Sequence, residues 1–130
     1  MIVGIGVDIV EIGRIGDLLE RYRDRFTHRV FTGEEIRYAE KGGKIAERLA
    51  GRFAVKEAVL KAFGTGKSGG ILWKDIETVR GTKGRPEVKL YGMASNYMNK
   101  MNGSKVLVSI AHDGGNAIAF VIIEKAGGKE

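Results

Sequence analysis

The N-terminal segment alternates between apolar side chains and small or acidic ones. One set of alternate positions holds branched apolar residues and the other holds glycine or aspartate: Val3, Ile5, Val7 and Ile9 against Gly4, Gly6 and Asp8. A period of two predicts a β-strand over residues 1–8. Glycine inside a strand indicates that another segment of backbone comes close to it. We therefore expect this strand to pack tightly against a neighbouring element.

A helical period follows the strand. From Glu11 to about Arg25, apolar and basic residues recur every three or four positions, which predicts one amphipathic helix. One face carries Ile12, Ile15, Leu19 and Tyr22, and another carries Arg14, Leu18, Arg21 and Arg25. Further along, Thr32 with Glu35 three residues later is typical of a capping box. This pair predicts the start of a second helix.

The longest helical pattern runs from Lys44 to Phe63. Its apolar positions are Ile45, Leu49, Phe53, Val59 and Leu60. Gly64 stands where a C-cap is expected, because glycine readily adopts the left-handed conformation that ends many helices. A glycine-rich loop over residues 64–70 follows this helix.

The C-terminal half predicts strands and one short helix. The pattern favours strands over 75–80 and 86–90, a helix over 93–101, and strands over 106–112 and 117–123. The four residues 113–116, Asp-Gly-Gly-Asn, favour a hairpin between the last two strands. This order of elements predicts an α+β fold in a single domain, residues 1–130.

Composition excludes several classes of protein. The 43% hydrophobic and 29% charged residues are ordinary for a soluble globular chain. The apolar stretches at residues 1–10 and 117–123 are far shorter than the ~20 residues that span a bilayer, so no membrane segment is expected. The start of the chain has no basic leader or cleavage pattern, which argues against an export signal. Cysteine is absent, which excludes disulfides and thiolate metal sites and favours the cytoplasm.

The net charge indicates an anionic partner. The chain carries a formal charge of +6 at pH 7. Such a charge favours nucleic acid, a polyphosphate or an acidic protein surface, and it does not choose among them.

Two glycine motifs fail as nucleotide-binding signatures. The run 64–68, Gly-Thr-Gly-Lys-Ser, resembles the end of a P-loop, but the first glycine of that motif would fall on Lys61. The run also follows a helix, whereas a P-loop follows a strand. Gly4 and Gly6 begin a dinucleotide fingerprint whose third glycine would fall on Ile9. Neither motif is retained.

Two carboxylates are candidates for a metal site. Asp8 lies in the N-terminal strand, although Asp8 with Glu11 also has the spacing of a helix cap and capping box. Glu57 and Lys61 are four apart on the long helix and share a face, which ordinary ion pairing explains equally well. Mg²⁺ needs only one or two protein carboxylates when substrate phosphates and waters complete its shell. Asp8 and Glu57 together would be enough protein ligands for a Mg²⁺ ion.

The remaining candidates are a histidine and an arginine face. His112 ends a strand just before a tight turn, and it is either a structural histidine or part of a site. The face with Arg14, Arg21 and Arg25 is either a solvated helix surface or a docking surface for an acidic partner.

Several motifs together resemble one known family. The segment 4–12, Gly-Ile-Gly-Val-Asp-Ile-Val-Glu-Ile, with Arg14 beyond it, is similar to the N-terminal motif of bacterial holo-(acyl carrier protein) synthases, the small class of 4′-phosphopantetheinyl transferases. Four further blocks follow in the family's order: Phe31-Thr32 with Glu35 and Tyr38, then 48–66, then 73–77 with Gly84, Pro86 and Leu90, then 109–113. The resemblance covers nearly the whole chain.

The resemblance implies a fold and a reaction. It implies the family's α+β fold, a long central helix packed on an antiparallel sheet, in a homotrimer with active sites at subunit interfaces. The reaction moves 4′-phosphopantetheine from coenzyme A to a serine of apo acyl carrier protein, in fatty acid biosynthesis, and releases adenosine 3′,5′-bisphosphate. The cofactor implied is Mg²⁺.

The resemblance also implies roles for individual residues. Asp8 and Glu57 would be metal ligands, and Glu57 and Lys61 the catalytic residues. Coenzyme A would contact Arg52, Lys61, Gly64, Thr65, Gly66, Ser109 and His112, and the acidic carrier protein would dock on Arg14, Arg21 and Arg25. Ala111 departs from the pattern, because many relatives carry a hydroxyl residue there.

Two other functions are compatible with parts of the sequence. A metal-dependent nucleotide phosphohydrolase would use the same carboxylates with water as the nucleophile. A basic nucleic-acid-binding domain would explain the charge, but its aromatic residues should lie among the basic ones. Here the aromatic residues fall mostly at apolar positions, so we expect neither nucleic acid nor a membrane as partner.

Overall fold

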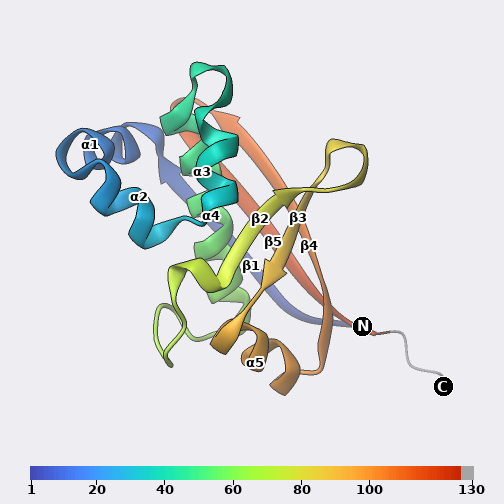
Figure 1. Cartoon of the computed structure of the whole chain (residues 1–130). Helices are drawn as coiled ribbons and strands as arrows, with labels where there is room; N and C mark the ends of the chain where they lie inside the picture. Colours follow the sequence, from blue (N-terminus) through green and yellow to red (C-terminus); the bar gives the residue numbers. More distant parts are fainter. Residues whose placement is uncertain (127–130) are drawn as a thin grey trace.

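The computed structural model describes residues 1–126, and the last four residues of the expected domain, 127–130, lie outside them. Five helices and five strands alternate in small groups (Figure 1). In chain order they are β1 (Ile2–Glu11), α1 (Ile12–Tyr22), α2 (Asp24–Val30), α3 (Gly33–Glu40), α4 (Ile45–Phe63), β2 (Ile76–Arg80), β3 (Pro86–Leu90), α5 (Gly92–Lys100), β4 (Gly103–Asp113) and β5 (Asn116–Lys125). The expected α+β class is confirmed.

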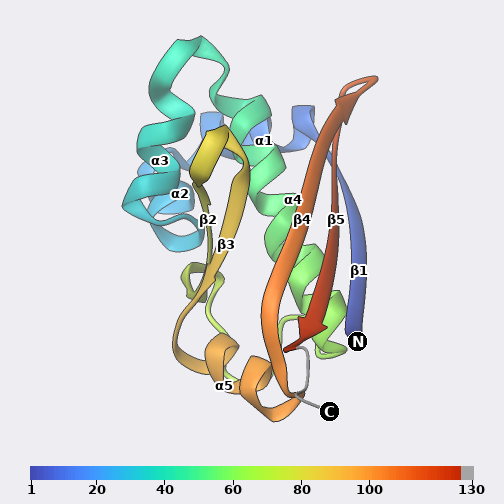
Figure 2. The same ribbon diagram turned by 90° about the vertical axis from the view of Figure 1, so that its right-hand side faces the viewer.

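The strands form two antiparallel sheets. The larger has the order β1-β5-β4, and the smaller is the β2-β3 pair. Figure 2 shows α4 lying between them, with the three-stranded sheet on one side and α3 and the β2-β3 pair on the other. Gly114 and Gly115, both with positive φ, form the predicted hairpin between β4 and β5. Among residues 1–126, no helix combines the length and apolar character needed to cross a membrane.

The glycines of β1 allow α4 to lie directly on the strand. A Cβ atom at Gly4 would lie 2.7 Å from the carbonyl oxygen of Ala62, and one at Gly6 would collide with the carbonyl of Ala58. Both of these carbonyls belong to α4. The expected close approach of another backbone is confirmed, and α4 is the element that makes it.

The apolar residues of β1 lie on the other face of the sheet. Ile5, Val7 and Ile9 are 59%, 49% and 61% exposed. No helix in residues 1–126 covers this face (Figure 2). Phe120 of β5 and Leu107 of β4 are exposed as well. The sheet therefore keeps an uncovered apolar face, which is uncommon on a chain that works alone.

The predicted helix over residues 11–25 is wrong in its extent. The strand β1 continues to Glu11, and Arg23, with a φ of 45°, separates α1 from α2. The break turns the chain so that Thr27 and Val30 become buried. Arg25 therefore lies on a different helix from Arg14.

The capping interpretation of Asp8 is also wrong. Asp8 lies within β1 and pairs with Ala119 of β5. The residue before α1 is Glu11, and its side chain makes no capping hydrogen bond. The other two predicted helix ends are confirmed: Thr32 and Glu35 form a reciprocal capping box, and Gly64, with a φ of 80°, ends α4.

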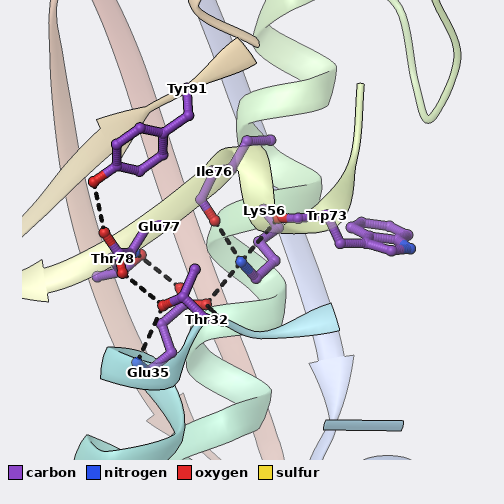
Figure 3. Close-up of polar contacts among 8 residues, drawn as sticks. All are labelled: Thr32, Glu35, Lys56, Trp73, Ile76, Glu77, Thr78 and Tyr91. Carbon is purple, nitrogen blue, oxygen red and sulfur yellow. Dashed lines mark hydrogen bonds and ion pairs between the residues drawn. The ribbon is translucent and has the colours of Figure 1, made fainter. Parts of the chain in front are cut away.

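A buried ion pair fixes α4 against α3 and β2. The ammonium of Lys56 is 2.9 Å from Oε1 of Glu35, and both side chains are fully buried. Lys56 also donates to the carbonyl oxygens of Trp73, at 3.0 Å, and Ile76 (Figure 3). All three hydrogens of the ammonium therefore have acceptors, as a buried lysine requires.

A second buried carboxylate extends this network to Tyr91, between β3 and α5. Glu77 accepts hydrogen bonds from the hydroxyl of Thr32, at 2.6 Å, and from that of Tyr91, at 2.9 Å (Figure 3). The backbone N–H of Thr78 donates to Oε2 of Glu35 at 2.9 Å. These bonds lock the rotation of α4 about its axis. Glu57 follows Lys56 directly, and neighbouring residues of a helix project ~100° apart. The side chain of Glu57 therefore points away from the network.

Candidate functional site

Asp8 and Lys61 meet on one side of α4. The ammonium of Lys61 lies 2.7 Å from Oδ1 of Asp8. The Asp8 side chain is largely buried at 12% exposure, whereas Lys61 is 57% exposed. The inner face of β1 therefore presents a fixed carboxylate to a lysine that remains open to solvent.

Glu57 lies one turn before Lys61 and completes a cluster with Asp8. Partial burial raises the pKa of the Glu57 carboxyl, and the negative charge of Asp8 raises it further. Lys61 and Arg14 oppose this rise. The hydrogen bond to Asp8 and its charge raise the pKa of Lys61, so the ammonium stays protonated. The predicted grouping of Asp8, Glu57 and Lys61 is present in the structure.

This cluster has donor chemistry that suits Mg²⁺. In residues 1–126, no group of three or more histidine, cysteine, aspartate or glutamate side chains could hold a metal on its own. Two carboxylates with oxygen donors are what Mg²⁺ takes from a protein when phosphates and waters supply the remainder. The raised pKa of Glu57 fits this reading, because a cation between the carboxylates would relieve their repulsion.

A cleft of about 410 Å³ opens on the other side of α4. It is lined by residues from α3, α4, the β2-β3 pair and β4: Tyr38, Arg48, Arg52, Arg80, Gly84, Pro86, Ile110 and His112. Nε2 of His112 donates to the carbonyl oxygen of Glu47 at 3.2 Å. Gly51 makes room for the imidazole, since a Cβ atom there would lie 3.3 Å from Nε2.

Arg52 is buried in this cleft without a carboxylate partner. Its side chain is 5% exposed, and its Nε has no hydrogen-bond partner in the described structure. Burial lowers the pKa of the guanidinium, and the positive charges of Arg48 and Arg80 add to that effect. The lining is therefore strongly cationic and suits an anion.

The aromatic ring of Tyr38 lies against two of these arginines. The guanidinium carbon of Arg52 is 3.8 Å from the ring centroid, and that of Arg48 is 4.7 Å from it. Sequence analysis missed Arg48 and Arg80 as lining residues and gave Tyr38 no role. The spacing of Arg48 and Arg52, four apart on one helix, is the signal that could have found the first.

The two groups of site residues lie on opposite sides of α4. Arg52 and Lys61 are nine residues apart, and at ~100° per residue they project in opposite directions. The loop of Gly64, Thr65 and Gly66 follows the Lys61 end of the helix. One chain therefore holds both groups but does not bring them together.

Ser109 lies away from the cleft. It is exposed, and it pairs across the sheet with Phe120. Ile110 and His112 line the cleft on the α4 side. Since side chains alternate between the faces of a strand, Ser109 faces the uncovered apolar side.

The three arginines proposed for docking are all exposed. Arg14 and Arg21 lie on α1, and Arg25 lies on α2 with its guanidinium 5.8 Å from the ring of Tyr22. The charge of Arg14 reaches Glu57. Of the three arginines, Arg14 therefore lies close enough to the carboxylate cluster to act on its charge.

The sequence of this chain is similar to that of one family of known proteins. The family model of the 4′-phosphopantetheinyl transferase superfamily matches residues 4–121. The holo-[acyl-carrier-protein] synthase of Koribacter versatilis (strain Ellin345) is 43% identical over 124 residues, which are 95% of this chain and 99% of that protein.

Two solved structures extend the similarity to three dimensions. The crystal structure of the holo-[acyl-carrier-protein] synthase from Neisseria meningitidis has a TM-score of 0.86 and 36% identity, covering 96% of this chain and 100% of that one. The Helicobacter pylori synthase in complex with coenzyme A has a TM-score of 0.81 and 32% identity, covering 92% and 99%. The chain belongs to the 4′-phosphopantetheinyl transferase superfamily.

Proposed function

We propose that this protein is a holo-(acyl carrier protein) synthase, which transfers 4′-phosphopantetheine from coenzyme A to a serine of apo acyl carrier protein. The observation that carries the proposal is the cluster of Asp8, Glu57 and Lys61 beside a basic surface. Similarity over 95% of the chain to a protein named for this activity supports it. The related Helicobacter pylori synthase in complex with coenzyme A supports that molecule as the substrate.

The reaction is a displacement at phosphorus. The serine oxygen attacks the phosphorus that carries the pantetheine arm, a new O–P bond forms, and the pyrophosphate P–O bond breaks. The electron pair of that bond leaves with adenosine 3′,5′-bisphosphate. Positioning and charge neutralisation supply most of the rate in such reactions.

The cluster supplies groups for both ends of this displacement. Glu57 accepts the serine proton, directly or through a water, and a raised pKa brings its basicity closer to neutral pH. Lys61 remains an ammonium and balances the charge that develops on the leaving phosphate. Asp8 and Glu57 would hold Mg²⁺, which neutralises pyrophosphate charge when bound.

The arginine cleft receives the nucleotide end of coenzyme A. Arg52 and His112 line this cleft. Gly64, Thr65, Gly66 and Ser109 complete the proposed binding set. This division assigns the reacting pyrophosphate to one side of α4 and the nucleotide to the other.

A homotrimer would join the two sides across a subunit interface. One chain holds the two groups on opposite sides of α4, and Ser109 lies with the exposed Val7 and Phe120 on the uncovered face of the sheet. Burying that face against other copies would remove exposed apolar area, which stabilises association. In this arrangement Ser109 of one subunit reaches a site that the next subunit shares.

The carrier protein docks on Arg14, Arg21 and Arg25. These exposed cations complement an acidic partner, and they help account for the charge of +6. The single domain extends over residues 1–130. A chain without cysteine suits a cytoplasmic enzyme.

Mass spectrometry of the carrier protein tests this function. We expect coenzyme A, Mg²⁺ and the protein to add one phosphopantetheine mass to an apo carrier. Absence of any mass gain with several apo carriers would contradict the proposal. Release of nucleotide from coenzyme A without a carrier would instead indicate a phosphohydrolase.

A further inference from the structure

The loop that follows α4 is rich in glycine, and its backbone takes up conformations that other residues rarely adopt. Four of its glycines have φ angles between 60° and 80°: Gly64, Gly66, Gly69 and Gly70. Glycine reaches these conformations without strain, but a free glycine-rich chain has many others open to it. Residues 66–70 are exposed to solvent. The composition of the loop therefore does not hold it in one place.

Hydrogen bonds within the loop are local. The hydroxyl of Ser68 donates to the carbonyl oxygen of Thr65 at 2.7 Å, and its backbone N–H donates to the carbonyl oxygen of Gly66 at 3.0 Å. The hydroxyl of Thr65 donates to the same carbonyl of Gly66 at 2.8 Å. These bonds shape the turn, but they do not attach it to another element. Packing has to supply that attachment.

Tyr97 of α5 packs against both ends of this segment. Both views of the fold show α5 and the loop at the same end of the molecule (Figure 1, Figure 2). A Cβ atom at Gly69 would collide with the hydroxyl oxygen of Tyr97 and lie 2.9 Å from its Cζ. The ring of Tyr97 is also stacked on that of Phe63, with 6.0 Å between the centroids and 22° between the planes. One side chain therefore contacts the last residue of α4 and the far end of the loop.

We propose that Tyr97 is a positioning residue for coenzyme A, which holds the loop 64–70 in the conformation that the substrate meets. The inference rests on the proposed function and deepens it, because residues 64–66 belong to the proposed binding set. Phe63 is two residues from Lys61, so Tyr97 fixes the start of the loop close to the proposed reacting groups. A loop that is held before binding loses less conformational freedom when the substrate binds, and this raises affinity.

Two neighbouring glycines offer a matched test. Gly69→Ala places a methyl group against Tyr97. Gly70→Ala places one at a similar positive φ, but there the Cβ atom would lie 3.5 Å from Cγ of Met93, an ordinary contact distance. Both variants carry the strain of an alanine in a left-handed conformation. Only Gly69→Ala adds a collision with Tyr97.

Steady-state transfer is measured for the wild type, both glycine variants, Tyr97→Leu, and the double variant Gly69→Ala with Tyr97→Leu. We expect Gly69→Ala to raise the KM for coenzyme A roughly fivefold over that of Gly70→Ala, the scale of the cost of ordering one side chain on binding. The kcat should stay within about twofold of the wild type, since the lost contact acts in binding.

The double variant tests whether the two positions act through one contact. Tyr97→Leu alone should raise the KM, because the loop loses its support. Leucine also leaves room for the added methyl group, so the double variant should have the KM of Tyr97→Leu.

Three results would overturn the inference. The first is an equal KM in Gly69→Ala and Gly70→Ala. The second is a fall in kcat with an unchanged KM. The third is additive effects of Gly69→Ala and Tyr97→Leu. If Tyr97→Leu does not fold, as judged by thermal unfolding, the two glycine variants still decide.

Hydrogen exchange separates this inference from the proposed function, because it needs no transfer activity. We expect the backbone amides of the loop to exchange roughly tenfold faster in Tyr97→Leu than in the wild type, with exchange in the buried middle of α4 unchanged. Coenzyme A should slow exchange of the loop in the wild type. Loop exchange that is unchanged by Tyr97→Leu, or by coenzyme A, refutes the role of Tyr97 whatever the transfer assay gives. Absence of transfer by a wild type whose loop shows both responses refutes the proposed function alone.

Discussion

Two lysines five residues apart on α4 make similar ion pairs in opposite surroundings. Lys56 lies 2.9 Å from Glu35 and is fully buried, whereas Lys61 lies 2.7 Å from Asp8 and is 57% exposed. Burial lowers the pKa of Lys56. The hydrogen bond to Asp8 raises the pKa of Lys61. The distance between the charges therefore does not distinguish the buried pair from the pair proposed to take part in the reaction, but solvent access and the surrounding acceptors do.

The comparison assigns a different task to each side of the helix. The Lys56 network gives every hydrogen of the buried ammonium an acceptor and ties α4 to α3 and β2 (Figure 3). The Lys61 cluster leaves its ammonium and part of Glu57 open. The buried pair holds the helix in the rotation that directs Glu57 and Lys61 toward Asp8.

The largest effect on stability is expected from Lys56→Met. Removing one partner of a buried ion pair leaves the charge of Glu35 without its cation, which costs about 3–5 kcal/mol. Chemical denaturation measures the free energy of unfolding. The double variant with Glu35→Gln removes both charges and should recover part of the loss. A loss below about 1 kcal/mol in the single variant would show that the network does not hold the helix.

Lys61→Met should produce the opposite profile. We expect transfer to carrier protein to fall by roughly 10²-fold or more, because the charge at the leaving phosphate is lost. The midpoint of unfolding should not change, since Lys61 is exposed. Lys67→Met, an exposed lysine in the following loop, serves as the control. A transfer rate equal to that of the wild type in the Lys61 variant would show that this lysine has no role in the reaction.

Glu57→Gln should give the smallest change in the free energy of unfolding, and the size of this change depends on pH. Because the folded pKa of Glu57 lies above its ordinary value of 4.5, the folded protein disfavours its ionised form. Stability is therefore lost as pH rises through the window between the unfolded and folded pKa. Without Mg²⁺, the glutamine variant should be more stable than the wild type above that window, by less than about 1 kcal/mol.

Below a pH of 4.5 this advantage should fade, because Glu57 is then protonated in both states. The difference in stability between the glutamine variant and the wild type is measured by thermal unfolding across the pH range. Glu34→Gln, at an exposed position, is the control. A glutamine variant that is less stable than the wild type at neutral pH would contradict the idea that burial and the charge of Asp8 disfavour the ionised carboxylate of Glu57.

Local signals in the sequence predicted much of this fold. The capping box at Thr32, the C-cap at Gly64 and the hairpin over 113–116 depend on neighbouring residues, and all three are confirmed. The break at Arg23 was not predicted, because no glycine or proline marks it. Burial of Thr27 and Val30 against the rest of the protein imposes it.

The candidate site was predictable only in part. The sequence assigns Asp8, Glu57 and Lys61 to one site, and in the structure Lys61 forms an ion pair with Asp8. Lys56 binds Glu35 and the backbone carbonyl oxygens of Trp73 and Ile76. Every residue has a backbone carbonyl, so the sequence does not indicate which carbonyls accept these hydrogen bonds. The stack of Tyr38 with Arg48 depends in the same way on how two helices pack.

One feature of the site could have been read directly from the sequence. Ser109 and His112 are three apart on a strand, so their side chains must lie on opposite faces of the sheet. This placement is one reason for proposing a site that more than one copy of the chain builds. The alternation of side chains along a strand predicts this placement from the sequence alone.

A subunit-mixing assay tests most directly whether the two sides of α4 form one site between copies. Lys61→Met and Arg52→Met are each expected to be inactive at low coenzyme A, because each lacks one side of the site. If the variants are unfolded and refolded together at equal amounts, the mixture should regain about a quarter of the wild-type activity, as random assortment at the interfaces of the proposed cyclic trimer predicts. A mixture that shows only the mean activity of the two parents, despite confirmed mixed trimers, would contradict a site shared between subunits.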